Sequence, residues 1–235
     1  MRYWLVMPAA GAGRRFGAER PKQYAPLLGR TVIEWALAPF LADARCAQIV
    51  IALAAEDVSW QEVAGRLATA AGRIRTVVGG AERSLSVRRA LGALEGHAAA
   101  GDWVLVHDAA RPCLAQSDLE SLISDLGTHP LGGLLATPFA DTLKQAAPGA
   151  DPEVAQTLER AGLYRALTPQ MFRFGQLCAA LDAAHAASRF PTDEAQALEW
   201  RGARPRLVTG LATNVKVTTA ADLAIAAGVL QARHA

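Results

Sequence analysis

Short apolar runs alternate with helical patterns along the first half of the chain, and this alternation constrains the fold more than any other feature of the sequence. The runs that read as strands are residues 3–7, 49–53, 75–78 and 103–106. Continuous apolar strands separated by helices are typical of a parallel sheet that is covered by helices on both faces. The sequence therefore predicts an α/β fold with three layers around a mostly parallel sheet.

Capping patterns mark where several helices of this fold begin. Thr31 and Glu34 have the spacing of a capping box and open a helix that runs through about Leu41. Ser117 and Glu120 repeat the same spacing. The other predicted helices are residues 62–71, a helix from Ser84 to Leu94 that Ser84 caps, a helix that starts at Thr192-Asp193-Glu194, and a last helix from about Ala220.

The turn after the first strand has the pattern of a phosphate-binding loop. Its sequence is PAAGAGRRFG at residues 8–17, and the Gly and Ala residues leave no large side chain between backbone N–H groups and a ligand. Several such donors can converge on phosphate oxygens without steric obstruction. Arg14, Arg15 and Lys22 add cations within or just after the turn. We expect a polyphosphate site here, with an arginine-decorated surface turn as the alternative.

Two better-known phosphate loops do not fit this turn. The dinucleotide pattern GxGxxG starts at Gly11 and Gly13, but Phe16 stands where a third Gly or an Ala belongs. The Walker A loop needs Gly-Lys followed by Ser or Thr, and the sequence contains no Gly-Lys pair. The pattern that remains, AGxGRR followed by PK, resembles the superfamily of sugar-nucleotide pyrophosphorylases and cytidylyltransferases.

Charge and length narrow the class of partner. The formal net charge of +2 is too small to suggest a nucleic-acid polymer, and the cations gather locally, which favours a small anionic ligand. A chain of 235 residues that is 51% hydrophobic can bury a sizeable core. Because we find no linker or internal repeat, we expect a single domain over residues 1–235.

Cysteine usage and hydropathy indicate the compartment. Cys46, Cys113 and Cys178 are odd in number and form no CxxC pair, which disfavours a disulfide framework or a zinc site and fits a reducing cytoplasm. The N-terminus lacks a signal-peptide pattern, and no apolar run approaches the ~20 residues that span a bilayer. We expect a cytoplasmic protein without a membrane partner.

Three features follow separate strands, and in a parallel sheet they meet at one edge. These are the Gly11 loop, Gly79-Gly80 and Asp108, and ligands of such sheets lie outside the carboxyl ends of the strands. Asp108 can hold Mg²⁺ or its waters beside a triphosphate, and Arg111 can bind a second phosphate through two nitrogens. The alternative is that Asp108 caps a turn and pairs with Arg111.

Two further segments carry candidate binding residues. Gly79-Gly80 would expose backbone to a planar base, with Ser86 available for a hydrogen bond, although the residues alone do not establish base recognition. Lys216 lies within an apolar run, residues 214–217, that reads as a strand, and a buried Lys needs an anionic partner. The alternative is an edge-strand Lys that prevents aggregation. No HExxH or GxSxG motif supports a hydrolase.

Residues 138–167 depart from the α/β pattern. Extended runs at 141–145 and 154–158 flank a turn at residues 148–152, which indicates a β-arm. The segment has too few large apolar residues for a core of its own. We therefore expect it to pack against another subunit as a dimerisation arm, with a mobile surface loop as the alternative.

Eight motifs occur in order along the chain: PAAGAGRRFG, PKQY, GGAERSLS, VLVHDAARP, PFADTLK, ALTPQMF, TDEAQALE and NVKVT. Together they resemble the 2-C-methyl-D-erythritol 4-phosphate cytidylyltransferases of the non-mevalonate isoprenoid pathway. The resemblance implies a nucleotide-diphospho-sugar transferase (Rossmann-like) fold and transfer of CMP from CTP to methylerythritol phosphate, with Mg²⁺ as cofactor and release of pyrophosphate. It also implies a homodimer whose interlocking arms contribute to the neighbour's active site.

The resemblance assigns roles to matching positions of this chain. Arg15 and Lys22 would act on the CTP phosphates, and Lys216 would lie between the α-phosphate and the incoming phosphate. Asp108 would hold the metal, directly or through a water. The nucleotide-binding residues would be Ala9, Ala10, Gly11, Gly13, Arg14, Gly80, Ala81, Ser86 and Asp108. The acceptor-binding residues would be Asp108, Arg111, Thr168 and Lys216, together with Thr142 and Arg160 from the partner's arm.

One position departs from the family, and three rival interpretations exist. Members often carry Asp where this chain has Ala81, and the change lowers affinity for the base only if the family's Asp side chain contacts the base.

The nearest rival is a ribitol-5-phosphate cytidylyltransferase; the ALTPQMF and NVKVT motifs favour methylerythritol phosphate. A regulatory nucleotide-binding module would be expected to lose Arg15, Lys22, Asp108 or Lys216, and all four are present. The third rival interpretation is a fusion with a cyclodiphosphate synthase domain. Because the chain ends soon after its last helix, we expect one domain.

Overall fold

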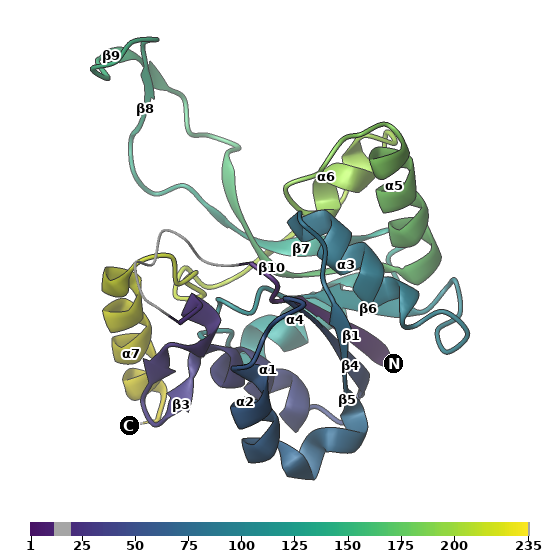
Figure 1. Cartoon of the computed structure of the whole chain (residues 1–235). Helices are drawn as coiled ribbons and strands as arrows, with labels where there is room; N and C mark the ends of the chain where they lie inside the picture. Colours follow the sequence, from purple (N-terminus) through teal and green to yellow (C-terminus); the bar gives the residue numbers. More distant parts are fainter. Residues whose placement is uncertain (12–19, 235) are drawn as a thin grey trace.

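A seven-stranded sheet forms the centre of the molecule in the computed structural model, which describes residues 1–11 and 20–234 (Figure 1). The strand order is β11-β7-β10-β6-β1-β4-β5. β10 runs antiparallel to β6 and β7, and the other neighbouring pairs are parallel. The strands are β1 (Tyr3–Pro8), β4 (Cys46–Leu53), β5 (Ile74–Val78), β6 (Trp103–Val106), β7 (Gly132–Pro138), β10 (Tyr164–Arg173) and β11 (Arg206–Thr209). The predicted mostly parallel α/β sheet is confirmed.

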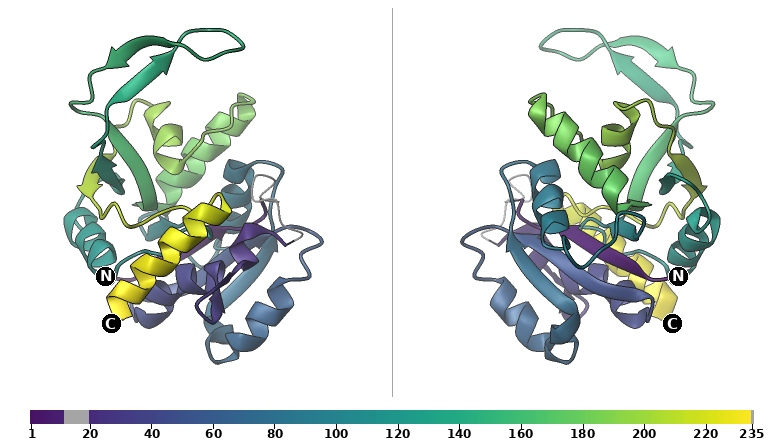
Figure 2. Two further views of the ribbon diagram at one scale, coloured as in Figure 1. Left: turned by 90° about the vertical axis from the view of Figure 1, so that its left-hand side faces the viewer. Right: turned by 90° about the vertical axis from the view of Figure 1, so that its right-hand side faces the viewer.

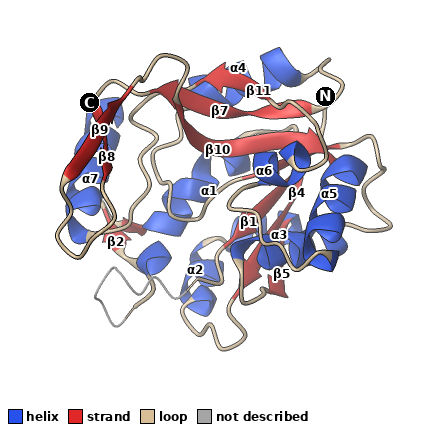
Figure 3. Ribbon diagram, turned by 90° about the horizontal axis from the view of Figure 1, so that it is seen from above, coloured by secondary structure: helices blue, strands red, loops and turns tan. Residues whose placement is uncertain are grey.

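Helices pack on both faces of this sheet, which explains why its central strands are apolar throughout (Figure 3). Leu5 of β1 belongs to one core cluster with Leu37 of α1, whereas Val6 belongs to the other with Leu91 of α3. Successive residues of a strand point to opposite faces, so both must be apolar. The helices are α1 (Val32–Ala42), α2 (Trp60–Arg66), α3 (Arg83–Gly92), α4 (Gln116–Leu126), α5 (Phe174–Ala186), α6 (Glu194–Glu199) and α7 (Ala220–His234). Within the described residues, each helix falls short of the length and apolarity needed to cross a membrane.

One predicted cap is confirmed and two are wrong. The Thr31 N–H donates to Glu34 Oε2 at 2.8 Å at the start of α1, as the capping box requires. Helix α4, where Ser117 and Glu120 have the same spacing, has Ala115 as its N-cap rather than Ser117. Likewise α3 has Glu82 as its N-cap, and Ser84 lies buried in the first turn. Both serines lie inside the helices that they were expected to open.

The run around Lys216 is not a strand. Residues 214–218 belong to no strand or helix of the described structure, and the Val217 N–H donates to the Ala110 carbonyl at 2.8 Å. Val217 is buried in a small satellite core with Ala226 and Leu230 of α7. The apolar residues of this run therefore contact the C-terminal helix, which explains why their pattern imitates a strand.

The predicted arm is present and stands away from the body of the protein (Figures 1 and 2). β8 (Leu143–Ala146) and β9 (Val154–Leu158) pair antiparallel in a two-stranded sheet of their own. Every residue of β9 is exposed, and Val154 retains 64% of its accessible surface. An exposed isolated hairpin of this kind is marginally stable in water by itself.

A short hairpin and two 3-10 turns complete the part of the chain that the structure describes. The hairpin strands are β2 (Pro26–Leu27) and β3 (Arg30–Thr31), and the turns are Lys22–Tyr24 and Ala68–Arg73. The predicted helix over residues 62–71 is thus divided into α2 and the second 3-10 turn. The first turn presents Lys22 to the sheet edge described below.

Candidate active site

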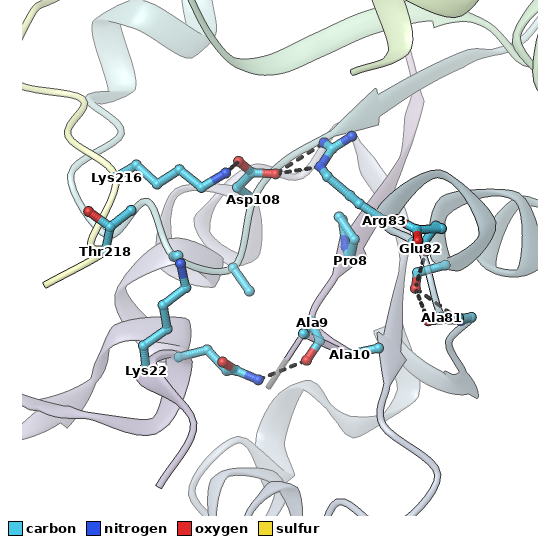
Figure 4. A pocket seen from close by; sticks show the side chains of 16 residues that line it. Pro8, Ala9, Ala10, Lys22, Ala81, Glu82, Arg83, Asp108, Lys216 and Thr218 are labelled. Atoms are coloured by element: carbon cyan, nitrogen blue, oxygen red, sulfur yellow. Dashed lines mark hydrogen bonds and ion pairs between the residues drawn. The ribbon is translucent and has the colours of Figure 1, made fainter. Parts of the chain in front are cut away.

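A pocket of about 400 Å³ opens outside the carboxyl ends of β1, β5 and β6 (Figure 4). Its walls come from five separate parts of the chain, as a parallel sheet requires of a site at this edge. The lining residues are Pro8, Ala9, Ala10, Gly11, Lys22, Gln23, Gly80, Ala81, Glu82, Arg83, Ser86, Asp108, Ala109, Ala110, Lys216 and Thr218.

Most of the predicted site residues lie in or beside this pocket. Those that line it are Ala9, Ala10, Gly11, Lys22, Gly80, Ala81, Ser86, Asp108 and Lys216. Arg111 and Thr168 lie directly beside Asp108, because Arg111 Nε is 3.8 Å from Asp108 Oδ2 and Thr168 Oγ1 accepts the Asp108 N–H. Thr142 and Arg160 belong to the arm and do not line the pocket of their own chain. Gly13, Arg14 and Arg15 lie outside the described residues.

Lys22 is placed by the residues that follow it. Gln23 is buried and donates from Nε2 to the Ala9 carbonyl at 2.8 Å, which ties the 3-10 turn to the end of β1. Tyr24 is also buried, and its hydroxyl donates to Asp57 Oδ2 at 2.7 Å. With both neighbours anchored, the Lys22 side chain extends into the pocket beside Asp108 and Lys216 (Figure 4).

The glycine pair after β5 forms a wall without side chains. A Cβ at Gly79 would lie 2.5 Å from Ala10 Cβ and 2.9 Å from Ser86 Oγ, and one at Gly80 would lie 2.5 Å from Leu85 Cβ. Larger residues therefore cannot replace this pair without displacing the loop. The Gly80 N–H donates to Ser86 Oγ at 3.0 Å, so the hydroxyl expected to face a ligand also holds the loop in place.

Asp108 is the electrostatic centre of the site. Its Oδ2 accepts from Lys216 Nζ at 2.7 Å, and its Oδ1 accepts from Arg83 Nε at 3.0 Å. Burial alone would raise the pKa of the Asp108 carboxyl, but the positive charges of Arg83 and Lys216 hold that pKa well below its usual range. The carboxylate therefore stays ionised at neutral pH, with one oxygen turned to each cation.

A buried chain of hydrogen bonds supports the turn after β6. Thr168 Oγ1 lies 2.9 Å from His107 Nδ1, and His107 Nε2 lies 3.1 Å from the Arg111 carbonyl. Because the carbonyl only accepts, the proton of the imidazole belongs on Nε2 and Thr168 donates to Nδ1. Burial lowers the pKa of His107 to about 4, which keeps the ring neutral. The structure thus confirms that the Asp108–Arg111 segment is a turn, with the Arg111 N–H donating to the Asp108 carbonyl at 3.0 Å.

Sequence reasoning missed Arg83, which lines the pocket and contacts two carboxylates. It stands inside the recognised GGAERSLS motif, and an arginine next to a glycine loop was a signal in the sequence. Its partner Glu194 lies 111 residues away, in a motif interpreted only as a helix start. That prediction is confirmed, since Asp193 caps α6 by accepting the Gln196 N–H, but it left the role of Glu194 open.

The lining residues suit an anionic ligand rather than covalent catalysis. Lys22, Arg83 and Lys216 supply positive charge, and the Gly11 and Gly80 segments supply unobstructed backbone. Among the residues that line the pocket in the described part of the chain, no Ser or Thr hydroxyl is hydrogen-bonded to a histidine. The described residues also contain no cluster of three metal-ligating side chains. A divalent cation here would need oxygens from a ligand.

Comparison with known proteins identifies the relatives of this chain. Residues 3–232 match the family described as "IspD: 2-C-methyl-D-erythritol 4-phosphate cytidylyltransferase". A protein of that name from Halorhodospira halophila is 52% identical over 235 residues, which cover 100% of this chain and 96% of the relative. One from Acidithiobacillus ferrooxidans is 50% identical and covers 99% of this chain and 98% of its own.

Solved structures agree over the full length. A crystal structure of 4-diphosphocytidyl-2C-methyl-D-erythritol synthase superposes with a TM-score of 0.83 at 37% identity, covering 97% of this chain and 98% of that chain. A 2-C-methyl-D-erythritol 4-phosphate cytidylyltransferase from Thermus thermophilus has a TM-score of 0.78 at 27% identity and covers 98% of this chain and 100% of its own.

Proposed function

The chain belongs to the 2-C-methyl-D-erythritol 4-phosphate cytidylyltransferase family, and from that premise we propose how its pocket transfers CMP from CTP to 2-C-methyl-D-erythritol 4-phosphate. The products are 4-diphosphocytidyl-2-C-methyl-D-erythritol and pyrophosphate. The observation that carries the proposal is the convergence of Lys22, Lys216 and two side-chain-free turns on one pocket at the carboxyl edge of the sheet. Such a pocket offers an anionic ligand both backbone donors and positive charge.

The nucleotide has a defined place in this proposal. The cytosine lies between Ala9 and Ala10 on one side and Gly80 and Ala81 on the other, where small residues leave room for a planar ring. Ser86 completes this end of the pocket. The triphosphate extends along the Gly11 turn towards Lys22, with the remaining loop residues Gly13, Arg14 and Arg15 continuing the same phosphate contacts.

The acceptor lies against the opposite wall, near Asp108 and Lys216. Arg111 supports this placement, because its Nε is buried and has no hydrogen-bond partner among the described residues. A buried unsatisfied donor of this kind is rare and is explained by a ligand that brings an acceptor. Thr168 lies beside it and adds to the acceptor wall. In this proposal Lys216 moves from Asp108 to a position between the two phosphates, and its side chain is 40% exposed.

We further propose that the protein acts as a homodimer in which each arm completes the neighbouring site. Thr142 and Arg160 lie on the arm and do not line the pocket of their own chain. The exposed β9 strand and its apolar Val154 and Leu158 are suited to a protein surface. Supplied by the partner, Arg160 would bring a cation to the acceptor phosphate.

The residues present fit Mg²⁺ held jointly by the protein and the nucleotide. Asp108 Oδ1 lies 3.0 Å from both Nε and Nη2 of Arg83, whereas Oδ2 accepts from Lys216 Nζ and keeps a second lone pair for a metal or a metal-bound water. Mg²⁺ is commonly held by one or two carboxylates, phosphate oxygens and waters. When bound it would neutralise charge on the triphosphate, with Asp108 as the protein group that holds it.

The reaction proposed for this site is direct in-line attack of an acceptor phosphate oxygen on the α-phosphorus of CTP. A phosphate monoester is largely doubly ionised near neutral pH, so no general base is needed. The difficulty lies in bringing two polyanions together, and positioning with fixed positive charge overcomes it. Two unit charges at about 4 Å attract by about 4 kcal/mol at an effective dielectric constant near 20. Lys22 and Lys216 therefore each make a large contribution.

The cytoplasm is the proposed location. Cys46, Cys113 and Cys178 are all unpaired thiols, and Cys46 and Cys113 are buried. Thiols persist in this form where the surroundings are reducing.

The experiment that tests the function compares two acceptors. The purified protein is incubated with CTP and Mg²⁺, and pyrophosphate release is measured with methylerythritol 4-phosphate and, separately, with ribitol 5-phosphate. We expect release with the first acceptor and little with the second. Release with ribitol 5-phosphate alone would contradict the proposed acceptor, and silence with both would contradict the assignment of the pocket.

A further inference from the structure

Arg83 joins two carboxylates that come from distant parts of the chain. Its Nη1 and Nη2 donate to the two carboxylate oxygens of Glu194 at 2.6 and 3.1 Å, and its Nε donates to Asp108 Oδ1 at 3.0 Å. Arg83 is the first residue of α3, Glu194 is the first residue of α6, and Asp108 follows β6. One guanidinium therefore connects the pocket to a helix outside it.

Glu194 is held firmly at the far end of this connection. Its side chain is only 1% exposed, and it is not among the residues that line the pocket. The neighbouring Asp193 caps α6 and also accepts from Gln170 Nε2 at 3.0 Å, while the Ala195 N–H donates to Gln170 Oε1 at 2.9 Å. Gln170 lies in the central strand β10, so the start of α6 is attached to the sheet. Glu194 thus offers Arg83 a fixed anchor.

The same contacts determine how Asp108 faces the pocket. With Oδ1 accepting from Arg83, the other oxygen is turned to Lys216 Nζ at 2.7 Å (Figure 4). Asp108 and Lys216 thus form an ion pair that would break if the Asp108 carboxylate rotated. Arg83 is held in turn, since Nη1 and Nη2 each donate to Glu194 and Nη2 also lies 3.0 Å from Asp108 Oδ1.

We infer that Glu194, acting through Arg83, is a positioning residue that orients Asp108. The inference rests on the proposed function, because it concerns the same pocket. Misplacement of a group near the reacting atoms by about 1 Å can cost on the order of 10²-fold in rate. A buried carboxylate beyond the pocket would in this way contribute to catalysis without touching the substrate.

Helix α3 contains a matched control pair. Arg88 donates to both carboxylate oxygens of Asp182 on α5, from Nε at 2.6 Å and from Nη2 at 3.1 Å. This pair also consists of a guanidinium and a carboxylate that join two helices, and neither residue lines the pocket, although Asp182 is 54% exposed and Glu194 only 1%. Arg88→Gln and Asp182→Asn therefore remove an interhelical ion pair without disturbing Asp108.

The test is a double-mutant cycle with steady-state kinetics for both substrates. We expect Arg83→Gln to lower kcat by about 10²-fold and Glu194→Gln by about tenfold, with the KM for CTP changed less than about twofold. If Glu194 acts through Arg83, the double variant is no worse than Arg83→Gln alone. Losses that multiply in the double variant, equal losses in the Arg88 and Asp182 controls, or a fully active Glu194→Gln variant would each overturn the inference.

A second variant distinguishes activity lost through misfolding from activity lost through misplacement of Asp108. Arg83→Lys keeps the positive charge, but a single ammonium cannot occupy the fork between Asp108 and Glu194. We expect a cooperative thermal unfolding transition, which shows that the variant folds, together with a kcat lowered at least about tenfold. Full activity of Arg83→Lys would contradict the inference, whether or not the Gln variants fold.

Failure of the inference can be told apart from failure of the proposed function. An active wild type with unimpaired Glu194→Gln contradicts the inference alone, and a wild type without CMP transfer contradicts the function. If the wild type does not transfer CMP, a crystal structure of Glu194→Gln still tests the inference, because it shows the orientation of Asp108. We expect the Asp108–Lys216 contact to be lost there, and an unchanged Asp108 rotamer with the contact intact would contradict it.

Discussion

Lys22 illustrates how a single cation is made effective at the residue scale. Its neighbours Gln23 and Tyr24 are buried and hydrogen-bonded, so the Lys22 backbone is fixed while its side chain extends into the pocket. A preorganised charge needs no rearrangement as charge develops on the leaving pyrophosphate. We expect Lys22→Ala to lower kcat on the order of 10²-fold, measured as pyrophosphate release at saturating substrates.

Arg75→Ala is the control for this substitution. Arg75 is an exposed cation of β5 that donates to the Ala93 carbonyl and lies outside the pocket. Its removal alters the net charge of the protein by the same amount as Lys22→Ala. Near-normal turnover of Lys22→Ala, or an equal loss in both variants, would remove Lys22 from the mechanism.

The pocket residues that could be predicted from the sequence are those whose position follows from a strand end. Ala10, Gly80 and Asp108 each come directly after an apolar run, and the parallel sheet brings such positions together. Arg83 was not predictable in this way, because its placement depends on Glu194 on another helix. A buried ion pair between distant segments leaves no local pattern in a sequence.

At the scale of the element, α1 shows what a cap adds to a helix. Glu34 accepts from the Thr31 N–H and also receives two nitrogens of Arg66 on α2, each at 2.9 Å. Glu34→Ala would remove the cap, and the Thr31 N–H and the Arg66 guanidinium would both lose the carboxylate to which they donate. We expect the free energy of unfolding to fall by about 2 kcal/mol, measured by urea denaturation.

Glu62→Ala is the matched control, since Glu62 also pairs with Arg66 but on the surface. Exposed ion pairs contribute little to stability. We expect a clearly smaller loss than for Glu34→Ala. Equal losses would show that the capping box is not what stabilises the start of α1.

The arm is the element whose proposed role depends on a second copy of the chain. If each arm completes the partner's site, Arg160→Ala raises the KM for methylerythritol 4-phosphate and leaves the KM for CTP unchanged. At a concentration of methylerythritol 4-phosphate far below the raised KM, where each variant alone is nearly inactive, mixing Arg160→Ala with Lys22→Ala should then restore activity, because hybrid dimers contain one site in which both residues are intact. Random pairing predicts recovery of about a quarter of wild-type activity.

Two results would contradict this account of the arm. Unchanged kinetics of Arg160→Ala would exclude the residue from acceptor binding. Failure of the two inactive variants to complement each other after subunit exchange would place Arg160 and Lys22 at the same site of one chain, or at no shared site.

Strands with a clean apolar run were predictable, and those with polar or edge positions were not. β10 was missed because polar residues interrupt it at Thr168 and Gln170, whose side chains serve the hydrogen bonds behind the pocket. β11 lies at the edge of the sheet and is largely exposed, so its pattern is weak. The run at 214–217 was mistaken for a strand because it packs on α7.

Acid stability is a property of the whole molecule to which several buried carboxylates contribute. Burial would raise the pKa values of Glu34 and Asp43, but hydrogen bonds from Arg66 and Thr31 to Glu34, and from Arg45 and Tyr3 to Asp43, lower them. Unfolded carboxylates titrate near pH 4, so the unfolded state binds more protons as the pH falls. We expect the free energy of unfolding to be steady near neutrality and to decline below about pH 5.

Asp43→Asn provides the comparison for this prediction. The variant should be less stable at pH 7 because Arg45 and Tyr3 lose a charged partner, yet its stability should fall less steeply with acid. Urea midpoints at a series of pH values measure both slopes. An identical slope in the variant, or a stability that rises on acidification, would contradict the assignment of these carboxylates.

The reaction proposed for this pocket aligns two phosphates and forms no covalent intermediate with the protein. The measurement that tests this claim most directly is the stereochemistry of transfer from CTP that carries a chiral thiophosphate at the α position. A single in-line displacement by the acceptor inverts the configuration at phosphorus, which is the result that this account predicts. Retention of configuration would require two displacements through the protein, and would contradict a site built only for positioning and charge.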